Sequence, residues 1–136
     1  MKPWLVYAII SLVLYGFWGF FPKLSVREID PLSALLYEIV GALFVGLLVL
    51  LGTGPKVQFT PPGFWFAFFT GVSGMVGTLF FFKAAKDGPI SVVVSLTALY
   101  PLITIILAAF LLKEPLTLRQ LLGMGLALMA IFLMSS

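Results

Sequence analysis

The sequence contains no cysteine and no histidine. It therefore has no disulfides, thiol nucleophiles, imidazole bases or common soft-metal ligands. Charge is also scarce, because only 10% of the 136 residues are charged, whereas a soluble domain carries roughly 25%. With 62% hydrophobic residues, the chain has too little polar surface to coat a globule in water. We predict that its solvent is the lipid bilayer.

Other absences from the sequence argue against several classes of function. No Gly-x4-Gly-Lys-Ser/Thr loop occurs, which argues against a nucleotide-driven pump in this chain. The basic residues are scattered singly, so nucleic acid is not an expected partner. We expect neither a metal nor a cofactor, and we do not expect an enzyme. No pair of carboxylates is available for acid–base catalysis, since four of the five acidic residues lie in expected loops: Glu28, Asp30, Asp87 and Glu114.

Long apolar runs are what the chain has in abundance. They cover residues 4–21, 32–51, 64–82, 90–112 and 117–134 and are 18 to 23 residues long. About 20 residues are needed to cross a hydrocarbon core of about 30 Å. We predict an all-α membrane protein in which residues 1–136 form a single domain of five transmembrane helices.

Local chemistry at the start of each run supports this division. Proline is tolerated in a first helical turn, where its missing N–H would have had no partner. Asp30 and Thr60 are suitable N-caps, and Thr117 with Gln120 has the form of a capping box. The prolines at or just before the runs are Pro3, Pro31, Pro61, Pro62, Pro89 and Pro115.

Two more prolines are found just after the first run and inside the fourth. Pro22 is expected to end the first span. Pro101 falls in the middle of the fourth, where it should kink the helix or remove a hydrogen bond. An ordinary tolerated kink and a hinge that lines a cavity both remain open.

The Lys/Arg bias of short loops sets membrane orientation. With five spans, the eight basic residues divide evenly. Lys2, Lys56, Lys113 and Arg119 lie on the N-terminal side, and Lys23, Arg27, Lys83 and Lys86 lie on the other. Either one small difference decides the orientation, or the chain inserts both ways. Two copies in opposite orientations would form an antiparallel homodimer, which resembles the inverted repeats of many transporters.

Polar and aromatic side chains recur at helical spacing on the first and fourth spans. Such stripes are common in helix packing, but an apolar, aromatic surface with a few hydroxyl groups also suits a small-molecule site. We predict a solute cavity lined by the first, third and fourth helices. Its candidate residues are Ser11, Tyr15, Trp18, Thr97, Tyr100, Pro101 and Thr104.

Glu38 is the single charge in the run 32–51. At about 1.5 Å per residue it lies roughly 9 Å below the start of that span. An acid near a helix centre costs about 2.5–3.5 kcal/mol on insertion scales. Protonation of the carboxyl or pairing with Lys23 would lower this cost. Two interpretations remain: a hydrogen-bonded packing residue, or a proton-coupling or cation-binding site in which Lys23 takes part.

Several short motifs, in order, resemble a known family. The segment 95–135 contains a small-x-x-Pro pattern from Ala98 to Pro101, then 114–117 (Glu-Pro-Leu-Thr), then Gln120-x-x-Gly123. These features, the hairpin 80–96 and the aromatic-Gly segment 15–23 resemble the EamA-type repeat of the drug/metabolite transporter superfamily.

The chain resembles a half-size member of that superfamily, with one five-helix repeat where most relatives carry two. Many relatives carry an arginine near the place of Glu38, so their charge-dependent recognition is not transferred. The resemblance implies transport of solutes that range from amino acids to cationic drugs and nucleotide-sugars.

We therefore expect a small secondary transporter of an organic solute, acting as an inverted homodimer in the plasma (inner) membrane of a prokaryote. The alternative is a non-transporting assembly subunit or scaffold in which Glu38 is structural.

Overall fold

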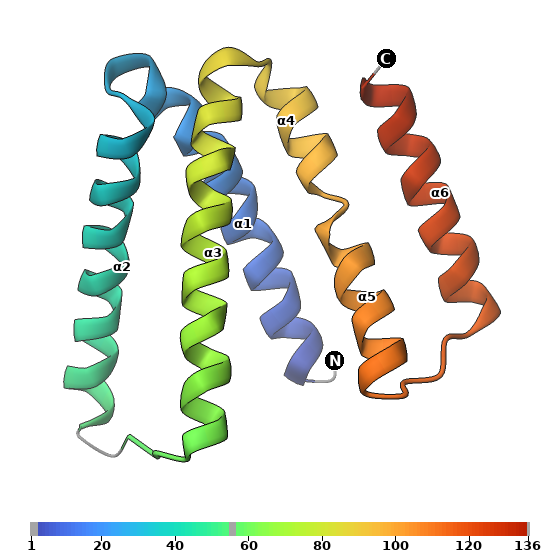
Figure 1. The fold of residues 1–136 in the computed structure, drawn as a ribbon, viewed down its shortest axis with the longest axis horizontal. Coiled ribbons are helices and arrows are strands. Elements are labelled where there is room, and N and C mark those ends of the chain that lie inside the picture. The colour runs from blue at the N-terminus through green and yellow to red at the C-terminus, as the bar shows by residue number, and fades with distance from the viewer. Residues whose placement is uncertain (1–2, 55–56, 136) are drawn as a thin grey trace. The chain divides into compact units, whose positions relative to one another are not determined.

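The computed structural model describes residues 3–54 and 57–135 (Figure 1). Lys2 and Lys56, two of the lysines in the predicted charge balance, lie outside these residues. The described chain is mostly helical, with short connecting segments and no strand in these two stretches. Its helices divide into an N-terminal unit, Met1–Asp87, and a C-terminal unit, Gly88–Ser136.

The N-terminal unit consists of three long helices. They are α1 (Pro3–Glu28), α2 (Pro31–Thr53) and α3 (Pro61–Asp87). All three are long and apolar enough to cross a membrane. Helix α3 contacts both α1 and α2, and α1 also contacts α2.

Buried residues of this unit gather towards one end of the three helices. They lie in the C-terminal halves of α1 and α3 and in the first turn of α2. Several are small, which lets helix backbones approach closely in lipid. The buried set is Gly19, Pro22, Val26, Ala34, Thr78, Phe81, Phe82 and Ala85.

The prediction that the first helix ends at Pro22 is wrong. Helix α1 continues through Pro22 to Glu28. A proline inside a helix removes one backbone hydrogen bond and is accommodated where neighbouring helices pack against it, and Pro22 is buried. The helix stops before Asp30, whose carboxylate caps α2 by accepting from the amides of Leu32 (2.9 Å) and Ser33 (3.1 Å).

The C-terminal unit consists of α4 (Ile90–Thr97), α5 (Tyr100–Leu111) and α6 (Leu118–Ser135). Helices α4 and α5 together form one apolar segment, Ile90–Leu111, which is long enough to span a membrane. The last segment, Leu118–Leu133, is apolar but shorter. Four long spans and one shorter apolar helix confirm the predicted fold class of an all-α membrane protein.

The fourth span is interrupted, as predicted from Pro101. Residues 98 and 99 form a turn between α4 and α5. The amide of Leu99 donates to the Leu96 carbonyl at 3.2 Å. This bond connects residues three apart, as in a 3-10 turn, and not four apart as in an α-helix. Pro101 lies in the first turn of α5. A backbone N–H at this position would have no acceptor within the helix, so its absence in proline costs no hydrogen bond.

The predicted capping box is also present. The Thr117 amide donates to Gln120 Oε1 at 2.8 Å, and the Gln120 amide donates to Thr117 Oγ1 at 3.3 Å. These reciprocal bonds satisfy donors that a helix start otherwise leaves unpaired. The capping box thus marks the start of α6.

Candidate functional site

Trp18, Glu38 and Phe81 form a cluster in the N-terminal unit, with one residue from each of its three helices. The Trp18 indole N–H donates to Glu38 Oε1 at 2.8 Å. The rings of Trp18 and Phe81 lie 5.3 Å apart between centroids, tilted by 32°. We call these three residues the carboxylate cluster.

The second oxygen of Glu38 has no partner in the described part of the chain. Oε2 is shielded from solvent and makes no hydrogen bond with any residue that the structure describes. A buried polar atom without a partner costs roughly 1–3 kcal/mol, and more when it is charged. The carboxylate cluster therefore holds one satisfied and one unsatisfied oxygen, which is unusual for a residue whose only role is packing.

Lys23, the expected partner of Glu38, makes a different contact. Its ammonium donates to the Ala85 carbonyl at 2.6 Å, joining α1 to α3. Ala85 is among the last four residues of α3, whose carbonyls lack a donor within the helix. In the structure, the hydrogen-bond donor to Glu38 is therefore the indole of Trp18 and not the ammonium of Lys23.

Ser11 and Tyr15 lie on α1 along the same stripe as Trp18, about two turns and one turn closer to the N-terminus, respectively. Both side chains are exposed. The side chain of Trp18 is less exposed, at 40%, because it packs against Phe81. The three candidates from the first span thus share a surface of α1 that leads to the carboxylate cluster.

The other candidates lie in the C-terminal unit. The Thr97 hydroxyl donates to the Val93 carbonyl (2.9 Å), and the Thr104 hydroxyl donates to the Tyr100 carbonyl (3.4 Å). Both hydroxyls thus donate within their own helices. Pro101 and Thr104 line a groove, whereas Thr97 and Tyr100 are not among its lining residues.

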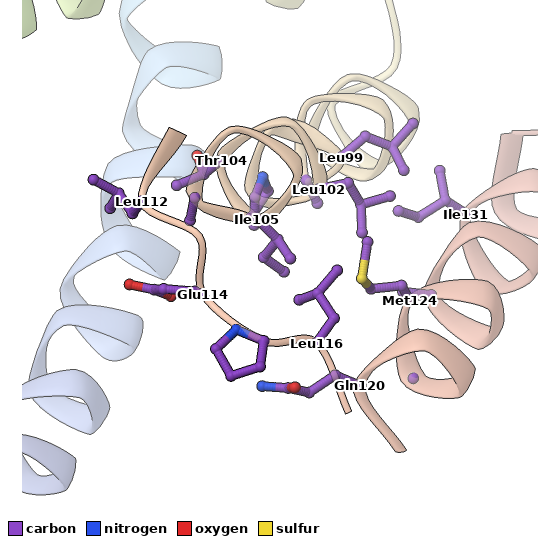
Figure 2. A pocket seen from close by; sticks show the side chains of 16 residues that line it. Leu99, Leu102, Thr104, Ile105, Leu112, Glu114, Leu116, Gln120, Met124 and Ile131 are labelled. Carbon is purple, nitrogen blue, oxygen red and sulfur yellow. The ribbon is translucent and has the colours of Figure 1, made fainter. Parts of the chain in front are cut away.

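That groove, of about 780 Å³, lies between α5, the loop after it and α6 (Figure 2). Figure 2 shows mostly aliphatic side chains around it, among them Leu102, Leu116 and Met124. Its polar side chains are few, and the carbonyl oxygen of Gln120 already accepts from Thr117. An apolar groove with so few free polar groups offers little to orient a solute.

Phe81 and Ala85 were missed as site residues, although the sequence held a signal for them. Small and polar residues line one face of the third span at Thr70, Ser73, Gly74 and Gly77. Continuing this face by three- and four-residue steps reaches Thr78, Phe81, Phe82 and Ala85, all of which are buried. The change from small to aromatic side chains hid the continuity of the face.

Apolar helices of membrane-spanning length, with a carboxylate held inside one of them, define an integral membrane protein. The chain belongs to the EamA-like transporter family, whose sequence model matches residues 2–136. An uncharacterized protein of Methanocaldococcus jannaschii is 30% identical over 135 residues, covering 99% of this chain and 98% of the relative. No solved structure matches the chain significantly.

Family membership makes the protein a membrane protein of the drug/metabolite transporter type. Members of this family are transporters rather than enzymes. Membrane-spanning helices make the lipid bilayer its surroundings.

Proposed function

We propose that this chain is a small secondary transporter that moves a small organic solute across the plasma membrane of a prokaryote. Residues 1–136 act as a single five-helix domain, and two copies in opposite orientations form the working homodimer. Transport by the EamA-like family supports the transporter class. The archaeal relative is consistent with a prokaryotic membrane.

Glu38 carries the proposal. It is a carboxylate inside a span, it is half-buried, and one of its oxygens lacks a partner among the described residues. Intramembrane carboxylates of this kind mark proton relays and ion pathways. We propose that Glu38 takes up and releases a proton as the cavity faces alternate sides, which couples the solute to the proton gradient. Lys23 supports this site by holding α1 against α3.

Replacement of Glu38 by glutamine tests the coupling. Glutamine keeps the shape and the carbonyl acceptor for Trp18 but does not titrate. In proteoliposomes, we expect Glu38→Gln to assemble normally and to lose flux driven by a pH gradient. Glu28→Gln, at the exposed end of α1, is the matched control and should transport normally. Wild-type proton-driven flux in Glu38→Gln would remove Glu38 from coupling.

We propose that the solute contacts Ser11, Tyr15 and Trp18 on α1 and Thr97, Tyr100, Pro101 and Thr104 on the fourth span. The shared surface of the α1 residues beside Glu38 supports their role. The interruption before Tyr100 supports a role for the fourth span, because broken helices commonly form transporter sites. Tyr15→Ala and Tyr100→Ala should impair flux more than folding. Normal flux in either variant removes that residue from the site.

Dual insertion of the chain is the basis of the proposed antiparallel dimer. The equal division of the eight basic residues supports it. Lys86→Gln, in the exposed last turn of α3, should shift the distribution of orientations strongly, as read by reporters fused to the C-terminus. A single orientation that no single charge moves would favour a parallel dimer or a separate partner.

A scaffold or assembly subunit is the second candidate function. The hydrogen bond from Trp18 to Glu38 favours it, because this bond joins α1 to α2 and would serve helix association alone. For a scaffold, Glu38→Ala, which removes the acceptor for Trp18, should lower the stability of the chain, Glu38→Gln should be stable, and no solute should cross a proteoliposome membrane. For the transporter, flux is lost in Glu38→Gln while the fold remains.

A further inference from the structure

We infer that the groove between α5 and α6 holds an anionic phospholipid of the surrounding bilayer. An acyl chain of this lipid lies in the groove, and its phosphate lies at the mouth, beside Lys113 and Arg119. The site uses none of the residues of the carboxylate cluster. It goes beyond the proposed transport of a solute and does not depend on it.

The groove is as long as one leaflet of a bilayer is thick. Its lining runs along α5 over residues 101–112 and along α6 over residues 120–131, which is about 16 Å on each helix. Half of a hydrocarbon core is about 15 Å thick. The loop that joins the two helices carries charged residues, so this end of the groove lies at the level of the headgroups. The groove therefore reaches from the headgroups to the middle of the bilayer, as an acyl chain does.

The lining and the width of the groove suit a flexible hydrocarbon chain. Figure 2 shows Ile105, Leu116 and Met124 directed towards the space between the helices. Spread over about 16 Å, the volume of about 780 Å³ corresponds to a cross-section of roughly 50 Å². A helix with its side chains is about 10 Å across, which is roughly 80 Å². The groove is therefore too narrow for a further helix but admits an acyl chain.

The helices of the C-terminal unit leave this space open. Helix α6 packs on α4, and α4 ends at Thr97, before α5 begins. Gly123 of α6 lines the groove, and a Cβ atom added to it would meet no other atom within 4 Å. Open space beside apolar side chains is filled by lipid when the chain is in a membrane.

Two cations flank the mouth of the groove. Lys113 comes directly after the lining residue Leu112, and Arg119 comes directly before the lining residue Gln120. Both basic side chains are exposed. Neither forms an ion pair with another residue in the described part of the chain. Basic side chains at pockets between membrane helices bind the headgroups of anionic lipids.

Glu114 also lies at the mouth, but it does not cancel this charge. Residues 113–119 contain two basic side chains and one acidic side chain, so an excess of one positive charge remains. Figure 2 shows the Glu114 carboxylate directed away from Leu116 and Met124. The mouth of the groove therefore attracts an anionic headgroup more strongly than a zwitterionic one.

The backbone of Lys113 gives an independent argument for a ligand. Its φ of 56° lies in the left-handed region, which has a steric cost for lysine and none for glycine. Such conformations persist where other interactions compensate for them, and they are frequent where ligands bind. No hydrogen bond or ion pair of the Lys113 side chain compensates within the described part of the chain. A lipid phosphate beside the ammonium supplies the missing interaction.

Three probes test the site by native mass spectrometry of the full chain released from detergent. Phosphatidylglycerol has an anionic headgroup and acyl chains, phosphatidylcholine has the same chains with a zwitterionic headgroup, and glycerol phosphate has the anionic group without chains. We expect one phosphatidylglycerol per chain, binding of phosphatidylcholine that is about tenfold weaker, and no retained glycerol phosphate. Glycerol phosphate that binds as tightly as phosphatidylglycerol overturns the role of the groove. Equal binding of the two lipids overturns the role of the cations.

Filling the groove tests where the acyl chain lies. Gly123→Leu places a side chain in the groove, whereas Gly125→Leu alters the same helix at a residue that does not line it. An added Cβ meets no other atom within 4 Å at either glycine, and circular dichroism checks that both variants remain helical. We expect Gly123→Leu to weaken phosphatidylglycerol binding by about fivefold or more, because the chain loses its apolar contacts. Gly125→Leu should bind as wild type, and equal binding in the two variants overturns the inference.

The same spectra test a second copy of the chain as the occupant of the groove. If a second copy lies there, Gly123→Leu converts a dimer into a monomer and leaves lipid binding unchanged. That result overturns the lipid site.

A double variant tests the headgroup contacts. Lys113→Gln with Arg119→Gln should weaken phosphatidylglycerol binding by about tenfold or more and leave phosphatidylcholine binding unchanged. Lys83→Gln with Lys86→Gln removes the same charge from exposed positions at the end of α3 and should bind phosphatidylglycerol as wild type. Equal losses in the two double variants would show a general attraction between a basic protein and an anionic lipid, which overturns a site at the groove.

Discussion

The two units of the chain are specified in different ways. In the N-terminal unit, side chains connect helices that are distant in sequence: Trp18 reaches Glu38, and Lys23 reaches Ala85. In the C-terminal unit, the hydroxyls of Thr97 and Thr104 donate within their own helices, and Thr117 and Gln120 cap the next. In these examples, side-chain hydrogen bonds join separate helices in the first unit, whereas in the second they are formed within a helix or at its start.

The largest expected difference concerns aromatic packing. Phe82 in α3 is 4% exposed, whereas Phe110 in α5 is 81% exposed. Phe82→Ala should lower the free energy of unfolding by about 2 kcal/mol, because a cavity remains even though lipid solvates the unfolded ring. Phe110→Ala should change it by less than about 0.5 kcal/mol. Reversible unfolding in mixed micelles measures both, and equal losses would remove the distinction between the units.

A smaller effect is expected from the lysine that joins α1 to α3. Lys23→Met keeps the aliphatic stem but removes the donor to the Ala85 carbonyl. A hydrogen bond from a charged donor contributes about 1.5 kcal/mol or more, so unfolding should become easier by about that amount. The control is Lys86→Met, which lies in the exposed last turn of α3, the helix that contains Ala85. If the two substitutions lower the free energy of unfolding equally, the contact between Lys23 and Ala85 does not stabilise the fold.

The helices themselves were largely predictable from sequence. Lipid leaves a backbone few alternatives to the helix, so apolar runs of sufficient length indicated the spans. Local signals also worked where their geometry is short-range: Asp30 caps α2, Thr117 and Gln120 form the capping box, and the break falls just before Pro101. Each of these depends on residues within four positions of one another.

The site was less predictable, because it depends on which helix faces meet. Glu38 was singled out by its charge, but its bond to Trp18 spans 20 positions and follows from how α1 packs on α2. The expected pairing with Lys23 rested on membrane side alone, and side does not determine which acceptor a long side chain meets. Pro22 shows the same limit, since burial among neighbours lets α1 continue through it.

Helix C-termini offer a third comparison between the units. The residue that follows α2 in a positive-φ conformation is Gly54 (φ 70°), whereas the one that follows α5 is Lys113 (φ 56°). Glycine adopts this conformation without steric cost, but other residues pay roughly 1 kcal/mol. Lys113→Gly should therefore stabilise the C-terminal unit by about 0.5 kcal/mol, after the greater freedom of glycine in the unfolded chain is counted.

Gly54→Ala is the reverse change in the N-terminal unit and should destabilise it by about 1–3 kcal/mol, because φ 70° with ψ −177° is a backbone conformation essentially restricted to glycine. Both variants are compared by thermal unfolding in the same detergent. A loss of stability in Lys113→Gly would show that the lysine side chain contributes more than its backbone strain costs.

The smallest expected difference concerns acid, and it distinguishes the two helix caps. Asp30 lies outside the spans, and the hydroxyl of Ser33, followed by backbone amides, lowers the pKa of its carboxyl below the ordinary 3.8. A carboxyl with a lowered pKa in the folded state stabilises the fold above pH 3.8. That contribution is lost as the pH falls through the folded value. The cap of α6 is built from Thr117 and Gln120, which do not titrate.

Hydrogen exchange of single amides in nanodiscs measures the difference. Below pH 3.8, protection at Leu32 and Ser33 should fall, because a protonated carboxyl is a weaker acceptor for their N–H groups. Protection at Thr117 and Gln120 should stay constant over the same range. Asp30→Asn, which caps without titrating, should make the α2 amides as insensitive to acid as those of α6. If protection falls equally at both caps, acid acts on the whole fold and not through Asp30.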